Sequence, residues 1–331
     1  MIVPHVLGIN VDTFKNSIKN NFKNTSKNTS KNTVKKPDSS SKKYVRETIS
    51  KMMSGLLKSH GVIPNAVAAL DNALWDLFAK IENIPLFELI RNETDQNQAD
   101  RNLVVRNSLK EYASLPFLGK LNENTVEKWD FLMNSVKTQG YKFIKFHGHG
   151  NIEGDEKLVS RFCGDSSIDF KYMKFMIDVE GEYKNVDDAK RLATICSETG
   201  RFIWLESIVP DYNFDQWNDI RESSPNLEFI PGGNYFLDSE TVKIVLNHNS
   251  NCWKRYRFDA GIAFGISNAI EISEIMLDFD KKSKKSSTKK IELQTWAHAL
   301  NQALGIHVML GLDNGGEYFE RPIVSENGEK T

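Results

Sequence analysis

Short apolar runs alternate with longer amphipathic segments from about residue 101 onward. The short runs predict β-strands, and apolar positions repeated every three or four residues predict α-helices. The predicted strands are 110–115, 143–147, 174–179, 202–206, 228–231, 255–259, 290–294 and 318–320. The predicted helices between them are 125–138, 186–199, 214–221, 239–246, 266–277 and 298–310. This alternation indicates a parallel sheet, because parallel neighbours need a crossover connection.

Eight strands over roughly 220 residues favour a TIM-type (β/α) barrel of the α/β class over an open sheet. An earlier helix is predicted over 65–81, where apolar residues recur at helical spacing and Pro85 follows. We therefore expect residues 1–100 to form a partial α-helical capping domain. Residues 101–322 are expected to form the barrel, and 323–331 a tail.

Two polar segments interrupt this pattern. Residues 23–33 read KNTSKNTSKNT, and the stretch near 20–43 carries no apolar face. It is predicted to be a disordered insertion, since it cannot bury enough surface to offset the entropy of ordering. Residues 281–290 read KKSKKSSTKK and are interpreted as a solvated loop, although a basic run can also bind acidic partners.

Composition narrows the function classes. The 331 residues are 40% hydrophobic and 26% charged, with a formal net charge of −1, so nothing global predicts binding to nucleic acid or to a membrane. Three widely spaced cysteines argue against a disulfide framework and a thiolate zinc site. No apolar run reaches membrane-spanning length and no secretory signal is evident. A cytoplasmic location is expected, with mitochondrial import as the alternative.

Polar residues stand at the carboxyl ends of the predicted strands, where barrel active sites form. Three of them, from consecutive strands, are Asp178, Glu206 and Asn234. Their side chains are expected to converge, and such oxygen ligands suit a hard cation such as Mg²⁺ or another divalent ion. The remaining strand-end residues are Lys145, His147, Asp259 and Gln294.

Six ordered segments carry a family resemblance. They are AVAALDNALWDLFAKIENIPLFELI (66–90), GYKFIKF (140–146), IDVEGEY (177–183), WLES (204–207), PGGNYF (231–236) and RFDAGIAFGIS (257–267). In this order and spacing the chain, from about residue 60 to 322, resembles the enolase superfamily, mandelate racemase/muconate lactonizing enzyme type. The resemblance implies a metal-dependent enzyme acting on a small-molecule carboxylate, and such barrels commonly form homo-oligomers.

The resemblance also implies roles for individual residues. Asp178 and Glu206 match the first two metal ligands, and Asn234 stands where most members have a glutamate. The matched catalytic residues are Lys145 and His147 of the Lys-x-Lys strand, with His147 in the place of the base, and Asp259 of the His-Asp dyad. The dyad histidine is replaced by Gln294, and His298 lies one helical turn further on. We assign substrate contacts to His149, Gln294 and His298.

In this superfamily the metal stabilises the enediolate that forms when a base removes the α-proton of a carboxylate. Lysine near a dication is expected either to lose its proton or to pair with substrate oxygens. Loss of a β-hydroxyl then gives dehydration of a sugar acid, whereas return of the proton on the other face gives epimerisation or racemisation. Because Gln294 replaces one acid/base residue, dehydration is the favoured prediction.

Other interpretations stay open. The early strands of the family's capping domain are not recognised here, so a truncated, non-catalytic barrel that acts as a binding or regulatory relative is the second hypothesis. Asn234 also suits a left-handed turn, and His147 also suits a polar position at a barrel mouth. Asp178 and Glu206 are alternatively loop-facing carboxylates that cap helices.

Overall fold

The computed structural model describes residues 64–95, 107–118, 122–164, 168–232, 238–249, 253, 255–282, 292–295 and 301–323. The strands are β1 Lys110–Ser114, β2 Phe143–His147, β3 Lys174–Asp178, β4 Phe202–Glu206, β5 Glu228–Ile230, β6 Arg255–Phe258, β7 Glu292–Thr295 and β8 Tyr318–Pro322. The helices are α4 Pro64–Glu82, α5 Leu86–Asp95, α6 Val126–Thr138, α7 Ile152–Cys163, α8 Val186–Glu198, α9 Phe214–Ser223, α10 Ser239–Asn249, α11 Ile266–Lys282 and α12 Asn301–Gly311.

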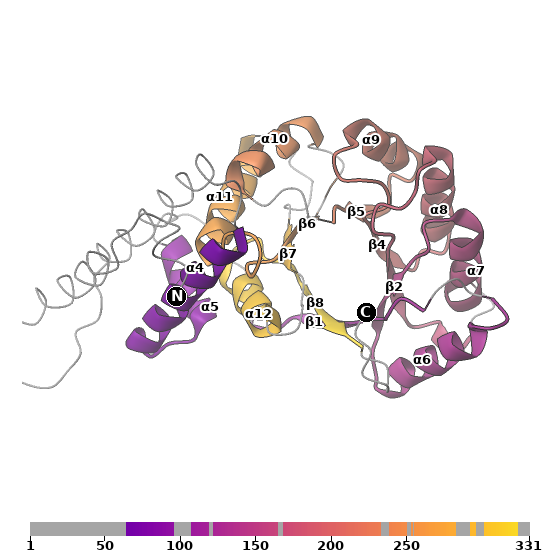
Figure 1. The fold of residues 1–331 in the computed structure, drawn as a ribbon, viewed down its shortest axis with the longest axis horizontal. Helices are drawn as coiled ribbons and strands as arrows, with labels where there is room; N and C mark the ends of the chain where they lie inside the picture. The colour runs from indigo at the N-terminus through magenta and orange to yellow at the C-terminus, as the bar shows by residue number, and fades with distance from the viewer. Residues whose placement is uncertain are drawn as a thin grey trace, which may run out of the picture.

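The strands follow one another round a ring that the helices enclose (Figure 1). Six parallel strands pair in the order β5-β4-β3-β2-β1-β8, and β6 pairs with β7. A parallel bridge between Phe229 and Trp253 links β5 to the segment before β6, and β7 contacts β8. The pairing of β1 with β8 joins the start of the ring to its end. The predicted α/β fold with a (β/α) barrel is confirmed.

Side chains along each strand alternate between two environments, as the period of a β-strand requires. On β2, Ile144 and Phe146 belong to the large core shared with the surrounding helices, while Lys145 and His147 occupy the opposite face. The lower interior of the ring is filled by a smaller apolar cluster. Its buried members are Tyr112, Met176, Trp204, Ile230 and Tyr318. The polar residues therefore lie on top of an apolar plug.

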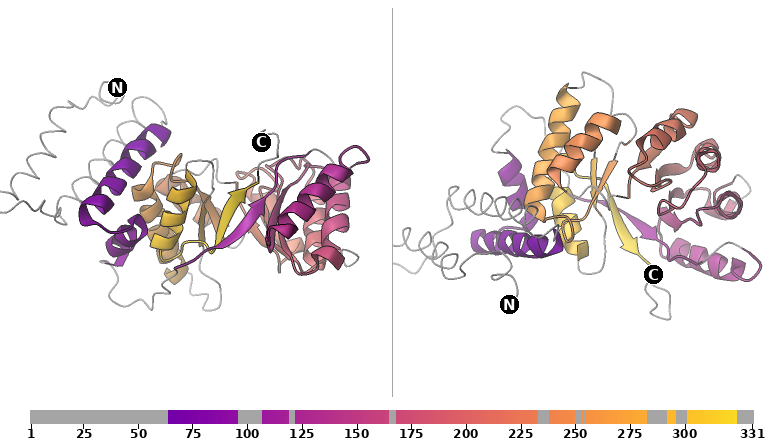
Figure 2. Two further views of the ribbon diagram at one scale, coloured as in Figure 1. Left: turned by 90° about the horizontal axis from the view of Figure 1, so that it is seen from below. Right: turned by 45° about the horizontal axis from the view of Figure 1, so that its top comes forward.

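Helix α4 docks at the start of α11, and the two views of Figure 2 show α4 and α5 at one end of the molecule. The buried Asp71 carboxylate accepts hydrogen bonds from the Ser267 backbone N–H (2.9 Å) and hydroxyl (2.6 Å). Asn72 accepts from the Ile266 N–H at 3.1 Å. These bonds satisfy donors at the beginning of α11, which its first turn leaves without helical partners.

Two helices were not predicted from the pattern, α5 and α7. Helix α7 contains Gly154 and the buried Asp155, which interrupt an apolar stripe. It forms because Asn151 caps it, accepting from the Gly154 N–H at 2.9 Å, and because Asp155 accepts from the Tyr183 hydroxyl at 2.8 Å. The predicted disordered insertion at 20–43 lies outside the described residues, and α11 extends into the first two residues of the predicted loop 281–290.

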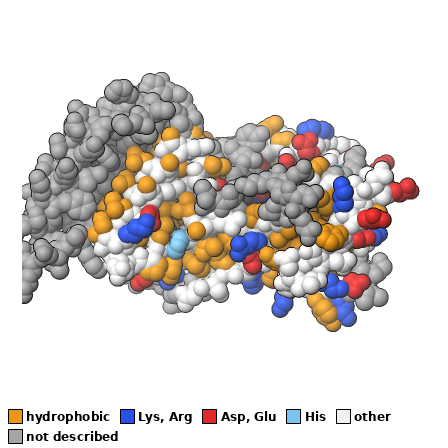
Figure 3. Space-filling view, turned by 60° about the horizontal axis from the view of Figure 1, so that its bottom comes forward, with side chains coloured by type: hydrophobic (Ala, Val, Ile, Leu, Met, Phe, Trp, Pro, Cys, Tyr) orange, Lys and Arg blue, Asp and Glu red, His pale blue; other side chains and the backbone are white. Residues whose placement is uncertain are grey.

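The surface view in Figure 3 shows charged side chains of both signs dispersed among hydrophobic ones, with no basic stripe on that face among the coloured residues. No helix within the described ranges is long and apolar enough to span a bilayer.

Candidate active site

Strand register brings three of the predicted residues to one level. His147 on β2 pairs with Asp178 on β3, and Asp178 pairs with Glu206 on β4. Each is the last residue of its strand, and the inward face of the strands holds all three. The sequence order of the motifs therefore becomes a row of side chains at the carboxyl end of the barrel, the end where barrel sites form.

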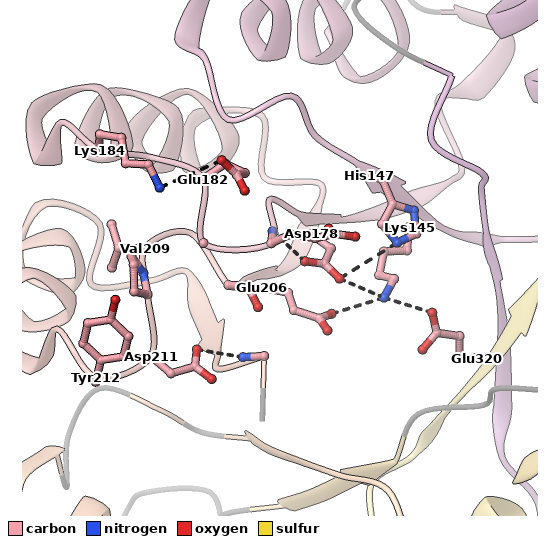
Figure 4. Close-up of a pocket in the computed structure, with 15 residues that line it drawn as sticks. Lys145, His147, Asp178, Glu182, Lys184, Glu206, Val209, Asp211, Tyr212 and Glu320 are labelled. Atoms are coloured by element: carbon pink, nitrogen blue, oxygen red, sulfur yellow. Dashed lines mark hydrogen bonds and ion pairs between the residues drawn. The ribbon is translucent and has the colours of Figure 1, made fainter. Parts of the chain in front are cut away.

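The two predicted metal-ligand carboxylates point toward the same cation, the ammonium group of Lys145 (Figure 4). Its Nζ lies 3.4 Å from Asp178 Oδ2, 3.4 Å from Glu206 Oε2 and 2.9 Å from Glu320 Oε1. Lys145 is 2% exposed. Asp178 and Glu206 thus converge instead of diverging into solvent.

A second buried cation completes the cluster. The Arg257 guanidinium donates from Nε to Glu206 Oε1 (2.7 Å) and from Nη2 to Glu206 Oε2 (2.8 Å). The same Nη2 lies 3.3 Å from Glu320 Oε2 and 3.2 Å from the Tyr112 hydroxyl. Tyr112 in turn donates to Glu320 Oε2 at 3.0 Å. The pair of charge-assisted bonds from Arg257 to Glu206 is of a type that is among the strongest that side chains form.

The surroundings of Asp178 disfavour its charged form, first through burial and then through a neighbouring negative charge. Burial, and then the neighbouring charge of Glu206, raise the pKa of the Asp178 carboxyl to about 6, against the opposing effect of Lys145. A hydrogen bond from the Glu180 N–H to Asp178 Oδ1 (3.0 Å) offsets only part of this. A further cation near Asp178 would therefore be stabilising.

The other members of the cluster are held charged. Burial opposes ionisation of Glu206 and Glu320, but Arg257 and Lys145 lower the pKa of both carboxyls below the ordinary value. Burial likewise opposes the charge on Lys145, yet Glu206 and Glu320 raise its pKa. With these partners Lys145 is an ammonium ion paired with the carboxylates of the cluster, and its behaviour beside a dication or a substrate stays a prediction.

The orientation of His147 is set by the backbone. Its Nδ1 lies 2.6 Å from the Leu115 carbonyl oxygen. Because a carbonyl can only accept, Nδ1 carries the proton, and the neutral ring has its lone pair on Nε2. Nε2 faces Asp178 Oδ2 at 4.0 Å. His147 therefore presents a potential base toward the cavity.

A polar cavity of about 510 Å³ opens above this cluster. Its outer wall comes from the loops after β3 and β4, where Glu180 (φ 52°) and Ser207 (φ 48°) adopt left-handed backbone conformations. Backbone of this kind is costly for residues other than glycine and is often found at functional sites. Asp211 Oδ1 accepts from the Gly232 N–H at 2.9 Å, which joins this wall to the end of β5. The wall also carries Glu182, Lys184, Val209, Pro210 and Tyr212.

Of four other predicted site residues, two lie away from the cavity lining and two lie outside the described residues. Asp259 is buried at the end of β6 and accepts from the Gly261 N–H (2.6 Å), and it is not among the described residues that line the cavity. The His149 ring packs edge-on against Phe117 and Trp129, also away from that lining. Asn234 and His298 lie outside the described residues.

Gln294 is described only by its backbone, which pairs with Arg257 in the β6–β7 ladder. Three members of the cluster, Tyr112, Arg257 and Glu320, were not predicted from the sequence. The available signal was strand periodicity, because Arg257 stands two positions before Asp259, and Glu320 two positions after Tyr318. Arg257 and Glu320 therefore share the inward face, and Tyr112 pairs with Glu320 in the β1–β8 ladder.

The oxygen atoms of this site are of the chemical type that binds a hard divalent cation. Asp178 and Glu206 supply carboxylate oxygens that each lie 3.4 Å from Lys145 Nζ, and burial, followed by the charge of Glu206, raises the pKa of Asp178. Within the described ranges no three His, Cys, Asp or Glu side chains are grouped to hold a metal ion. Further ligands would come from the Asn234 position, water or the substrate.

Comparisons with known proteins show which proteins this chain resembles in sequence and in fold. Residues 38–91 match the family model described as mandelate racemase / muconate lactonizing enzyme, N-terminal domain. The crystal structure of a putative mandelate racemase/muconate lactonizing enzyme from Pseudovibrio sp. is 25% identical, with a TM-score of 0.67; the match covers 86% of this chain and 67% of that one.

Two more distant structures have the same fold. The 3,6-anhydro-D-galactonate cycloisomerase from Zobellia galactanivorans is 21% identical with a TM-score of 0.64, over 87% of this chain and 72% of that one. A mandelate racemase/muconate lactonizing protein from Paracoccus denitrificans PD1222, complexed with magnesium, is 16% identical with a TM-score of 0.65, over 84% and 69%.

Proposed function

The chain belongs to the mandelate racemase/muconate lactonizing enzyme family of the enolase superfamily, and from this premise we propose that it is a divalent-metal-dependent lyase that dehydrates a hydroxy acid or sugar acid. Enzymes of this family are metal-dependent and abstract the proton next to a carboxylate. The proposed metal ligands are Asp178 and Glu206, with Asn234 as a third. Mg²⁺ is the proposed ion, as in the Paracoccus denitrificans relative.

One observation carries the proposal: two buried carboxylates converge beside a histidine whose Nδ1 contacts a backbone carbonyl and whose Nε2 faces Asp178. When bound, the divalent cation supplies Lewis-acid stabilisation of negative charge on the substrate carboxylate. This charge stabilisation is needed because an unaided α-proton is far too weakly acidic for imidazole.

The chain's own residues then perform the proton transfers. His147 Nε2 accepts the α-proton, and the bond from Nδ1–H to the Leu115 carbonyl stabilises the imidazolium that results. Lys145 donates hydrogen bonds to the substrate carboxylate from within the carboxylate cluster. In a substrate with hydroxyl groups on both the α- and β-carbons, the β-hydroxyl departs with the C–O electron pair and His147 Nε2–H returns the proton to it, giving water and an enol that becomes the 2-keto acid. Loss of one proton and one hydroxide thus balances as one water.

The test is solvent exchange combined with product detection. Purified protein with MgCl₂ and a panel of hydroxy acids and sugar acids in D₂O is expected to form 2-keto acid, detected with a carbonyl reagent. His147→Asn is expected to lower the rate by about 10²–10⁴-fold, the usual contribution of a positioned acid/base group, and to retain the fold by circular dichroism. Deuterium incorporation into unreacted substrate would separate proton abstraction from elimination.

Other outcomes distinguish the alternatives. Deuterium exchange with inversion and without 2-keto acid would replace the dehydratase by an epimerase. Absence of both exchange and product across the panel, with Mg²⁺ bound, would favour a non-catalytic barrel that binds carboxylates.

A further inference from the structure

Arg257 is the most completely enclosed charge in the candidate site. It lies on the inward face of β6, with 0% of its surface exposed. Its guanidinium group donates hydrogen bonds to both carboxylate oxygens of Glu206, at 2.7 and 2.8 Å. No role in the proposed mechanism uses this arginine, although it contacts Glu206, one of the three proposed metal ligands, directly.

Both carboxylate oxygens of Glu206 already accept hydrogen bonds from protein donors. Oε1 accepts from Arg257 Nε, and Oε2 accepts from Arg257 Nη2, from the Trp204 indole at 3.3 Å and from Lys145 at 3.4 Å. A carboxylate oxygen has two lone pairs, so Oε2 has more donors than lone pairs. A metal ion that bound Glu206 through Oε2 would have to displace at least one of these donors, and one that bound through Oε1 would share that oxygen with Arg257 Nε.

The net charge of the cluster also indicates that Arg257 influences metal binding. Among the described residues the cluster holds three carboxylates, Asp178, Glu206 and Glu320, and two cations, Lys145 and Arg257, for a net charge of −1. A divalent cation changes this to +1, and one substrate carboxylate then gives zero. Without Arg257, the loaded site would have no net charge, and an anionic substrate would lose part of its attraction.

We propose that Arg257 is a built-in counter-cation that competes with the divalent metal for Glu206, keeps the cluster stable in the absence of metal, and leaves the metal-loaded site one positive charge for a carboxylate. This inference rests on the proposed function, because it takes Glu206 as a metal ligand. Arg257 is a positioning residue and is not expected to touch the reacting atoms. It makes metal binding weak and reversible.

The experiment measures Mn²⁺ binding to the full chain, from the free Mn²⁺ signal in electron paramagnetic resonance, without substrate. Arg257→Gln is expected to bind Mn²⁺ about tenfold more tightly than the wild type or better, a change equivalent to about 1.4 kcal/mol. The matched control is Arg255→Gln. Arg255 lies on the same inward face of β6 and is 3% exposed, but it pairs with Glu228 at 3.0 Å. It is expected to change the affinity by no more than about twofold.

Each result is informative. If the wild type and Arg257→Gln bind Mn²⁺ equally well, the role of Arg257 is wrong and the proposed function is unaffected. If neither binds Mn²⁺, the metal-dependent function and the inference both fail. If Arg257→Gln is unfolded alone but folds when MnCl₂ is added, the metal has replaced the arginine and the inference is supported.

A second variant decides the remaining case, in which Arg257→Gln folds under neither condition. Arg257→Lys keeps the positive charge but loses the planar two-donor fork. It is expected to bind Mn²⁺ about threefold more tightly than the wild type, because Glu206 then has one oxygen less firmly held. Unchanged or weaker binding by this variant would overturn the inference.

Discussion

Asp178 holds a carboxylate in surroundings that disfavour its charge. Burial and the charge of Glu206 raise its pKa from 3.8 to about 6, although Lys145 lies 3.4 Å away. Lys145 offsets only part of this rise in pKa, and its ammonium group also pairs with Glu206 and Glu320. A residue that reduces stability in this way is typical of a site arranged for a ligand, since function and stability often oppose each other.

The raised pKa predicts how stability depends on pH. The folded state holds the Asp178 proton more tightly than the unfolded state, so this group's contribution is fully present below about pH 4 and is lost as the pH rises through about 6. In metal-free buffer, Asp178→Asn is therefore expected to be more stable than the wild type at pH 7, by up to about 3 kcal/mol. Urea denaturation at pH 4.5 and pH 7 measures it.

The comparison between the two pH values is the control. The advantage of Asp178→Asn is expected to shrink at pH 4.5, where the native carboxyl is mostly protonated. A variant that is less stable than the wild type at pH 7 would contradict the view that burial and Glu206 disfavour the charged form of Asp178.

At the scale of elements, helix α4 is fixed to the barrel by a close approach at the start of α11. Gly265 has φ +92°, and a Cβ at this position would overlap the Asp71 carboxylate. That carboxylate holds the first turn of α11 through Ser267. The glycine is needed both for its left-handed backbone and for the space it leaves.

Gly265→Ala is therefore expected to lower the free energy of unfolding by about 3 kcal/mol or more, because the backbone strain and the overlap with Asp71 add. Gly140→Ala is the matched variant, since Gly140 has φ +84° and a Cβ added there would meet nothing within 4 Å. It is expected to cost about 1 kcal/mol from backbone strain alone. Chemical denaturation measures both, and equal losses would show that the Asp71 contact adds nothing.

At the scale of the whole molecule, the strands make a ring whose upper layer carries charge and whose lower layer is apolar. The cluster above the apolar plug has a net charge of −1 among the described residues, so a bound dication is expected to stabilise the entire fold. Ligand binding to the native state stabilises a protein in proportion to the logarithm of ligand concentration.

Saturating MgCl₂, at about 100 times its dissociation constant, is expected to add about 2.7 kcal/mol and to raise the midpoint of thermal unfolding by a few degrees. Asp178→Asn is expected to show no such shift, and NaCl at equal ionic strength controls for screening. Differential scanning calorimetry provides the measurement. No response of the wild type to Mg²⁺ or Mn²⁺ would contradict the proposed metal dependence.

The sequence by itself determined the elements and the row of strand-end residues. Apolar periodicity placed β2 and β4 with their observed bounds and most other elements within a few residues, because burial of alternate side chains is a local property of the chain. Since all strands are parallel, it also followed that residues ending consecutive strands, such as Asp178 and Glu206, lie at one end of the barrel.

Only the tertiary structure decided which charged and polar side chains contact one another. Arg257 and Glu206 are 51 residues apart, and Tyr112 and Glu320 are 208 apart, so no local pattern pairs them. Helix α7 likewise depends on a distant partner, Tyr183, for its buried Asp155. Hydrophobic periodicity reports which face of an element is buried, whereas the pKa of a buried carboxyl depends on every charge that the closed ring brings near it.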